Sequence, residues 1–139
     1  EPYTVEQIVN LYKLLSKLGE PYGVISQTEF FIYSKKDREA IEKCQELGLS
    51  FPEITTWIRA NKEDFKLVRD MGIRETGVLV SCSDYHILKK MNMTRSECMK
   101  HYLEVLSLAF EEGVIPTCHF EDITRAIFTV LLYLLCDDI

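Results

Sequence analysis

The stretch Thr76-Gly-Val-Leu-Val-Ser-Cys82 decides the fold class of this chain. It is almost continuously apolar, as expected of a strand that lies in a parallel sheet and is buried on both faces by helices. Before it, Asn61 predicts the start of a short helix that ends near Met71. After it, Thr94-Arg-Ser-Glu97 is a capping box that predicts a helix to about Glu112. The segment therefore predicts one βα unit with a helix on each side of a buried strand.

The same alternation continues in both directions along the chain. Apolar residues at helical spacing predict a helix over about 5–18, and β-branched and aromatic residues predict a strand over about 23–33. The other expected elements are a helix over 34–47, a strand over 53–58, a short helical or irregular stretch over 84–92 and a strand over 114–120. This order indicates an α/β fold with parallel strands. Both a doubly wound sheet and part of a (β/α)8 TIM barrel fit, and a complete barrel needs about 250 residues, so the chain would be about half of one.

Composition and missing motifs exclude several classes of protein. The chain is 47% hydrophobic and 27% charged, which is ordinary for a soluble globular protein, and its net charge of −6 argues against a nucleic-acid partner. The longest apolar run, 126–136, is too short to span a bilayer, and we recognise no signal peptide. GxGxxG, P-loop and GxSxG motifs are absent. Five cysteines without CxxC spacing favour reduced thiols in a cytoplasmic protein.

Polar side chains follow each predicted strand at its carboxyl end. In both architectures these ends meet at one edge of the sheet, where functional groups gather. Because they recur on successive strands, they are typical of a site that binds an anion and moves protons. The candidates are Glu29, Arg59, Ser83, His86, His119 and Glu121.

Each candidate also has a structural interpretation. Glu121 could be a general acid or base, with a pKa raised in a partly dry cleft, or could form an ion pair with Arg125. Ser83 could cap the next helix. His86 and His119 could bind a metal, donate hydrogen bonds or serve only the fold, and His101 is expected to lie on a solvated helix face.

Four strand-end segments carry a family resemblance. They are Ser26-Gln-Thr-Glu-Phe-Phe-Ile-Tyr33, Pro52-Glu-Ile-Thr-Thr-Trp-Ile-Arg-Ala60, Ser81-Cys-Ser-Asp-Tyr-His86 and Cys118-His-Phe-Glu-Asp-Ile-Thr-Arg-Ala126. They resemble segments of the Re-type citrate synthases, which belong with isopropylmalate and homocitrate synthases among the metal-dependent barrel enzymes. Trp57-Ile-Arg-Ala60 and His119-Phe-Glu-Asp-Ile-Thr-Arg125 are the most specific to the citrate-forming branch.

The resemblance implies a (β/α)8 barrel in which these segments are strands two to five. It implies a Claisen-type condensation, in which acyl-CoA loses a methyl proton and the enolate attacks a 2-oxo acid. The leading reaction joins acetyl-CoA to oxaloacetate to give citrate, and homocitrate or 2-isopropylmalate synthesis is the alternative. A divalent metal (Mn, Co, Mg or Zn) and an arginine would polarise the oxo group, and the intact enzyme is expected to be a homo-oligomer.

By the same resemblance, the candidates take specific roles. Glu121 would assist acid–base steps or orient substrate, and His86 would act beside it as a catalytic group. The expected substrate-binding residues are Glu29, Arg59, Ser83 and His119, with Arg59 as a partner for a substrate carboxylate.

The chain departs from the family pattern at two motifs and in its last residues. The family's Arg-Asp-Gly and His-x-His motifs, which supply metal ligands, are absent, so no metal ligand is expected in this piece and the piece alone is expected to be inactive. Residues 1–126 are interpreted as a partial catalytic barrel. Residues 127–139 are interpreted as an out-of-frame tail, because a one-base deletion in codons for the family's Asp-Ile-Tyr-Gly-Phe-Val-Val-Pro-Phe can give Ile127-Phe-Thr-Val-Leu-Leu-Tyr-Leu-Leu135. A genuine apolar helix is the alternative.

A hypothesis of another class is a non-catalytic α/β binding module. It predicts a soluble, cooperatively folding monomer. A half barrel leaves open sheet edges and predicts self-association instead.

Overall fold

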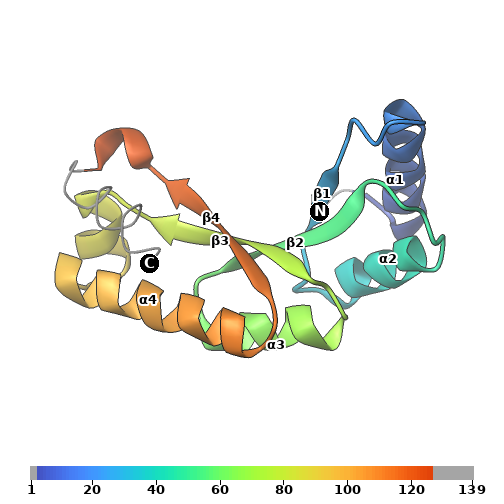
Figure 1. Ribbon diagram of the computed structural model, residues 1–139. Helices are drawn as coiled ribbons and strands as arrows, with labels where there is room; N and C mark the ends of the chain where they lie inside the picture. Colours follow the sequence, from blue (N-terminus) through green and yellow to red (C-terminus); the bar gives the residue numbers. More distant parts are fainter. Residues whose placement is uncertain (1–2, 127–139) are drawn as a thin grey trace.

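The computed structural model describes residues 3–126, which form the alternating strands and helices that the sequence predicts (Figure 1). The elements in chain order are α1 (Val5–Gly19), β1 (Gln27–Phe30), α2 (Lys35–Gln45), β2 (Glu53–Arg59), α3 (Lys62–Asp70), β3 (Glu75–Ser81), the π-helical turn η1 (His86–Lys90), α4 (Arg95–Glu111), β4 (Ile115–Glu121) and the 3-10 turn η2 (Ile123–Arg125). The tail interpreted as out of frame, 127–139, lies outside the described residues.

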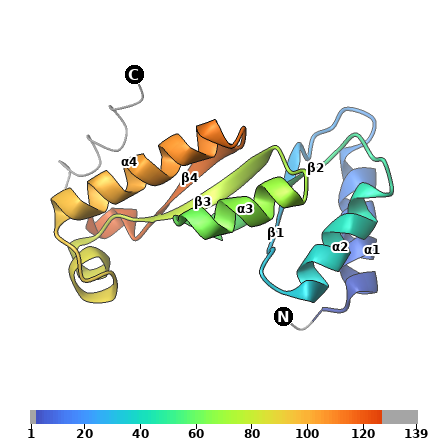
Figure 2. The same cartoon turned by 90° about the horizontal axis from the view of Figure 1, so that it is seen from below.

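The order of the strands distinguishes the two architectures. The four strands form one parallel sheet in the order β1-β2-β3-β4, so the order never reverses as it does in a doubly wound sheet. Successive right-handed crossovers in one direction place their helices on the same face. Figures 1 and 2 show α3 and α4 on the same side of the sheet. Within the described residues the fold is therefore a sector of a (β/α)8 barrel, as predicted.

The two faces of the sheet differ in chemistry because side chains alternate along each strand. Even-numbered residues such as Ile58, Val78 and Val80 point toward the helices and are buried with Phe65 and Val105 in one core. Odd-numbered residues form the other face, which is largely polar. The residues of this face are Gln27, Glu29, Glu53, Thr55, Trp57, Arg59, Glu75, Gly77, Leu79, Ser81, Ile115, Thr117, His119 and Glu121. In a complete barrel this face would line the interior.

Side-chain caps start the helices where the sequence predicts. The capping box of α4 is present, with the Thr94 amide donating to Glu97 Oε2 at 2.8 Å and the Glu97 amide donating to Thr94 Oγ1 at 3.2 Å. Asn61 caps α3 by accepting from the Asp64 amide at 2.9 Å. These caps fix where α3 and α4 begin. They therefore also hold the segments just before the two helices, which carry Arg59 and His86.

The first strand is shorter than predicted. A strand was expected over about 23–33, whereas β1 covers only Gln27–Phe30. Gly23 has a positive φ of 62°, so the chain is still turning there. At the other end, Ser34 is already the N-cap of α2 and the chain must bend before it. The turns at both ends limit the length of this strand, and composition alone does not reveal them.

Residues 3–126 contain neither a disulfide between their cysteines nor a helix that could span a membrane. The four cysteines at residues 3–126 form no disulfide with one another, and burial raises the pKa of the Cys44 and Cys82 thiols to about 11. None of the helices in that range combines the length and hydrophobicity needed to cross a membrane.

Candidate functional site

The carboxylate of Glu121 is the centre of the candidate site. Glu121 is the last residue of β4, and its Oε2 accepts a hydrogen bond from Ser81 Oγ at 2.6 Å and another from Lys90 Nζ at 2.9 Å. His86 Nδ1 lies 3.3 Å from the same oxygen. These contacts all reach Oε2, so Oε1 is the oxygen that a ligand could approach. We name Ser81, His86, Lys90 and Glu121 the Glu121 cluster.

The π-helical turn η1 supplies two members of this cluster. Its first residue is His86 and its last is Lys90, and the wider turn brings both side chains to one carboxylate. Turns of this kind occur mostly as single-turn insertions and frequently at functional sites. The sequence predicted a short helical or irregular stretch here but did not indicate its hydrogen-bond pattern.

His86 is held near Glu121 without a full hydrogen bond. Its side chain is 19% exposed, and Nδ1 makes no hydrogen bond with any group in residues 3–126 despite the 3.3 Å distance to Glu121. Ser83 is buried, and its Oγ accepts from the His86 amide at 3.3 Å, as the capping interpretation expected. Ser83 therefore positions the turn, and the imidazole Nδ1 is buried where it faces the Glu121 carboxylate.

The electrostatics of Glu121 correct one expectation. A raised pKa was considered possible, but the structure lowers the pKa of this carboxyl, first through the hydrogen bond from Lys90 and then through that from Ser81. The alternative ion pair with Arg125 is also wrong, because Arg125 Nε donates to Asp122 Oδ1 at 2.6 Å. Asp122 turns the chain with a φ of 63° and so separates Arg125 from Glu121. Glu121 is an ionised carboxylate, able to accept a proton or a hydrogen bond.

Glu29 and His119 form a second pair on the polar face. Glu29 Oε1 lies 3.1 Å from His119 Nε2, although β1 and β4 are separated by two strands. His119 precedes Glu121 by two residues, so both point from the same face of β4. Glu29 also borders a hollow of about 280 Å³ with Phe31 and Trp57, whose rings meet edge to face at 5.8 Å.

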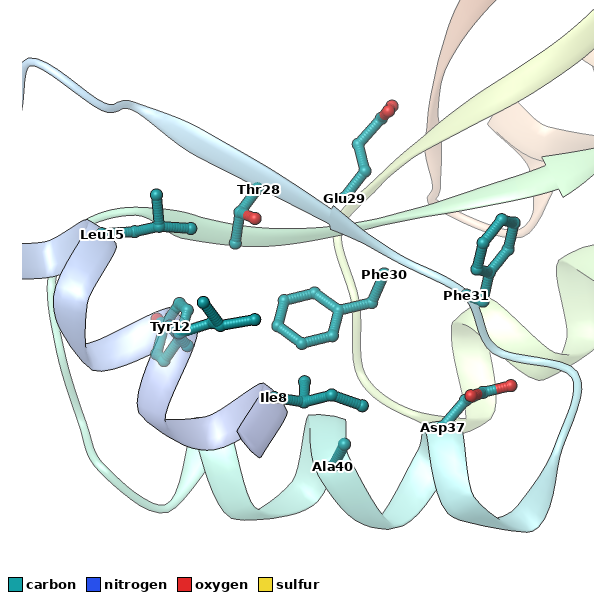
Figure 3. Close-up of a pocket in the computed structure, with 10 residues that line it drawn as sticks. Ile8, Tyr12, Leu15, Thr28, Glu29, Phe30, Phe31, Asp37 and Ala40 are labelled. Carbon is teal, nitrogen blue, oxygen red and sulfur yellow. The ribbon is translucent and has the colours of Figure 1, made fainter. Parts of the chain in front are cut away.

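A second cavity, mostly apolar, lies on the other side of β1. Its volume is about 250 Å³, and Figure 3 shows Ile8 and Tyr12 of α1 and Phe30 of β1 pointing toward one another in it. Glu29 points away from these side chains in the same view. The cavity thus belongs to the packing of α1 against the sheet and not to the polar face.

Arg59 lies at the end of β2, where its guanidinium already has a carboxylate partner. Nε and one terminal nitrogen donate to Asp64 at 3.1 and 3.2 Å, and the guanidinium carbon lies 5.0 Å from the centre of the Tyr33 ring. The Arg59 side chain is 63% exposed, whereas that of Asp64 is 5% exposed. This fork geometry suits carboxylate recognition, but in the described structure the carboxylate belongs to the protein.

Three other residues differ from expectation. His101 is only partly exposed, and its Nε2 lies 2.9 Å from the Ala60 carbonyl oxygen, which ties α4 to the end of β2. Ser81 and Lys90 were not selected as candidates, yet both contact Glu121. Ser81 could have been found from its place at a strand end beside the predicted site, whereas nothing local to Lys90 indicated a contact.

Lys90→Met tests the cause of the lowered Glu121 pKa. We expect the pKa of this carboxyl to rise toward or above its ordinary value of 4.5, as followed by carbon-detected NMR titration of the glutamates. Because the folded-state pKa is depressed, the ionised carboxylate stabilises the fold above 4.5, and this contribution is lost as pH falls through the folded value. Acid unfolding of Lys90→Met should therefore depend less on pH below 4.5.

Lys89→Met is the matched control, since Lys89 is an exposed neighbour in the same turn. It should leave the Glu121 titration unchanged. An unchanged titration in Lys90→Met would show that Lys90 does not hold the carboxylate ionised.

Metal ligands do not gather in the described part of the chain. Across residues 3–126 no group of three or more His, Cys, Asp or Glu side chains could hold a metal ion. The Glu121 cluster contains one carboxylate and one imidazole but also a serine and a lysine, and an ammonium group opposes a bound cation. Residues 3–126 therefore do not provide a metal site by themselves.

Comparison with known proteins agrees with this geometry. The HMGL-like family model matches residues 1–134. The chain is 58% identical over 127 residues to the citrate (Re)-synthase of Clostridium kluyveri (strain ATCC 8527 / DSM 555 / NBRC 12016 / NCIMB 10680 / K1), covering 91% of this chain and 28% of the relative. It is 56% identical over 125 residues to the citrate (Re)-synthase of Syntrophus aciditrophicus (strain SB), covering 90% and 20%.

A more distant relative extends the comparison. The 2-phosphinomethylmalate synthase of Streptomyces hygroscopicus is 34% identical over 128 residues, covering 90% of this chain and 29% of the relative. The chain thus spans between 20% and 29% of the length of these three relatives. With a family model that matches nearly its whole length and a parallel, barrel-ordered sheet, the chain belongs to the HMGL-like family.

Proposed function

We propose that this chain is a sector of an acyl-CoA/2-oxo-acid condensing enzyme that joins acetyl-CoA to oxaloacetate and gives citrate. The observation that carries the proposal is the ionised Glu121 carboxylate, held by Ser81 and Lys90 at the carboxyl end of β4. Active sites of barrel enzymes lie at this end of the strands. The names and high identity of the two citrate (Re)-synthases support the choice of reaction.

The proposed chemistry needs a group that accepts or guides a proton. The methyl group of acetyl-CoA loses a proton, and the resulting enolate carbon forms a bond to the oxo carbon of oxaloacetate. The oxo oxygen gains a proton, and water then cleaves the thioester to release CoA and citrate. Glu121 is ionised and can accept a proton or orient the water or substrate through Oε1. Lys90 and Ser81 fix the carboxylate in place, and His86 provides a nearby imidazole.

The other candidate residues are proposed to bind substrate. His119 and Glu29 lie on the same face as Glu121, and Ser83 fixes the turn that carries His86. Arg59 could bind a substrate carboxylate only if its guanidinium left Asp64 or bound both carboxylates at once. A divalent metal would polarise the oxo group when bound to the complete enzyme. A cytoplasmic location and a homo-oligomeric complete enzyme are parts of the same proposal.

The second candidate reaction is the same condensation with a different 2-oxo acid. A probable 2-isopropylmalate synthase of Ignicoccus hospitalis and a homocitrate synthase of Saccharolobus islandicus are 33% and 27% identical to the chain. These identities are well below those of the citrate (Re)-synthases, so oxaloacetate is proposed ahead of 2-oxoisovalerate and 2-oxoglutarate.

A grafted enzyme tests the proposal. Residues 1–126 would replace the matching segment of the Clostridium kluyveri citrate (Re)-synthase, to which the chain is 58% identical. CoA release would be measured with oxaloacetate, 2-oxoglutarate and 2-oxoisovalerate in turn. We expect turnover with acetyl-CoA and oxaloacetate and a lower kcat/KM with the other oxo acids.

The unmodified relative and a graft carrying Glu121→Gln serve as controls. A folded graft that turns over none of the oxo acids would contradict the proposed function. A graft that prefers another oxo acid would keep the condensation and move the assignment to that substrate.

A further inference from the structure

Gly77 lies in the middle of β3, directly beneath the Glu29–His119 pair. A Cβ atom at this position would lie 2.5 Å from Glu29 Oε1 and 2.9 Å from His119 Nε2. It would also lie 3.2 Å from Cδ1 of Trp57 on the neighbouring strand. The first two distances are shorter than real Cβ atoms tolerate, so any other residue here would occupy the space where the pair meets.

The backbone gives no reason for a glycine at this position. The φ of Gly77 lies outside the left-handed region, in contrast to Gly23, Gly48, Gly72 and Gly113. Gly77 is paired in register with Trp57 on one side and Thr117 on the other, within two parallel ladders. Glycine weakens the interior of a strand because it brings no side chain to pack. The space that the missing side chain leaves free, and not the backbone conformation, explains a glycine at position 77.

We propose that Gly77 is a positioning residue of this site, and that its missing side chain lets Glu29 of β1 and His119 of β4 pair across the two central strands. The pair would otherwise have to rise over a methyl group at the centre of the sheet. Both side chains are partly exposed, at 41% and 38%, so solvent screens their attraction and the space above Gly77 matters for keeping them together. The inference concerns the pair itself and does not depend on the reaction proposed above.

The nature of the clash predicts what alanine would do. Glu29 Oε1 and His119 Nε2 are the far ends of side chains, so they can move aside while the strands stay paired. Gly77→Ala should therefore separate the pair and keep the fold. The Glu121 cluster lies beyond Gly77 toward the strand ends, and none of its residues supplies the atoms nearest to a Cβ at this position, so it should be unaffected.

NMR of the histidine rings in the full chain tests this. The chain has three histidines, so the His119 ring signals can be assigned with His119→Gln. In the chain with Gly77, Glu29→Gln should shift the His119 ring nitrogen signals. In the Gly77→Ala chain the same substitution should shift them no longer. Trp57 is the only tryptophan, and its emission reports changes at the same point.

Gly19→Ala is the matched control, because Gly19 also has an ordinary φ but lies at the end of α1. It should leave the effect of Glu29→Gln on His119 intact. An equal His119 shift with alanine at position 77, or no shift in the chain with Gly77, would overturn the proposal. If Gly77→Ala does not fold, recovery in Gly77→Ala/Glu29→Ala supports the clash with Glu29, and no recovery overturns it.

Discussion

Glu121→Gln in the grafted enzyme is expected to lower kcat/KM for citrate formation by about 10²- to 10⁴-fold, the usual contribution of a positioned acid–base group. Glutamine has nearly the same shape and can still accept the hydrogen bonds of Ser81 and Lys90 through its amide oxygen. It cannot take up a proton at neutral pH, however. The loss should therefore appear in kcat more than in KM, as measured by CoA release under saturating and limiting oxaloacetate.

Glu111→Gln is the matched control for this change. Glu111 is an exposed residue at the end of α4, just before the amino end of β4, whereas Glu121 lies at the carboxyl end of that strand. Its substitution should leave both parameters unchanged. A loss confined to KM in Glu121→Gln would mean that Glu121 only binds substrate, and a change below about tenfold would remove it from acid–base chemistry.

Local patterns in the sequence were sufficient to predict the fold. The apolar stretch at 76–82 became the buried strand β3, and the Thr94–Glu97 capping box starts α4. Both features depend on neighbours within one turn or one strand, where sequence and structure are directly linked. The sequence left two architectures open, since the strand order, which decided between them, depends on which strands pair across the sheet.

The positions of the candidate residues were predictable, but their partners were not. Glu121 and His86 lie together at the strand ends as expected. Lys90 reaches Glu121 from 31 residues away through a π-helical turn, and no spacing rule predicts that hydrogen bond. The lowered pKa of Glu121 follows from this contact and from Ser81, so its direction could not be derived before the contacts were known.

For Arg59 too, the sequence predicted the position of the side chain but not its partner, although Asp64 is only five residues away. The sequence supplied a guanidinium at a strand end, and the structure adds that Asp64, in the first turn of α3, already occupies it. The Glu29–His119 pair depends on a residue between its partners, because Gly77 acts by lacking a side chain. An isolated glycine in a strand pattern permits close approach, but the groups that use the space are known only from the folded sheet.

Phe65→Ala is expected to cost about 3–5 kcal/mol of folding free energy, the largest effect on stability that we predict for a single substitution. Phe65 lies in α3, is fully buried and belongs to the same core cluster as Ile58 and Val78 of the sheet. Removing its ring leaves a cavity between α3 and the strands. Small domains have only about 5–15 kcal/mol in total, so the variant should be largely unfolded or unfold at much lower urea concentration, as followed by far-ultraviolet circular dichroism.

Phe110→Ala provides the comparison, since Phe110 is the same residue type on α4 but is 68% exposed. It should change the free energy of unfolding by no more than about 0.5 kcal/mol, so the difference between the two variants measures burial and not the loss of an aromatic ring. Equal effects would mean that α3 does not pack on the sheet as described. The packing of α3 also matters at the site, because Asp64 precedes Phe65 and holds the guanidinium of Arg59. A milder variant, Phe65→Leu, should keep the fold and loosen α3, and should therefore weaken the Arg59–Asp64 ion pair while the contacts of Glu121 with Ser81 and Lys90 remain.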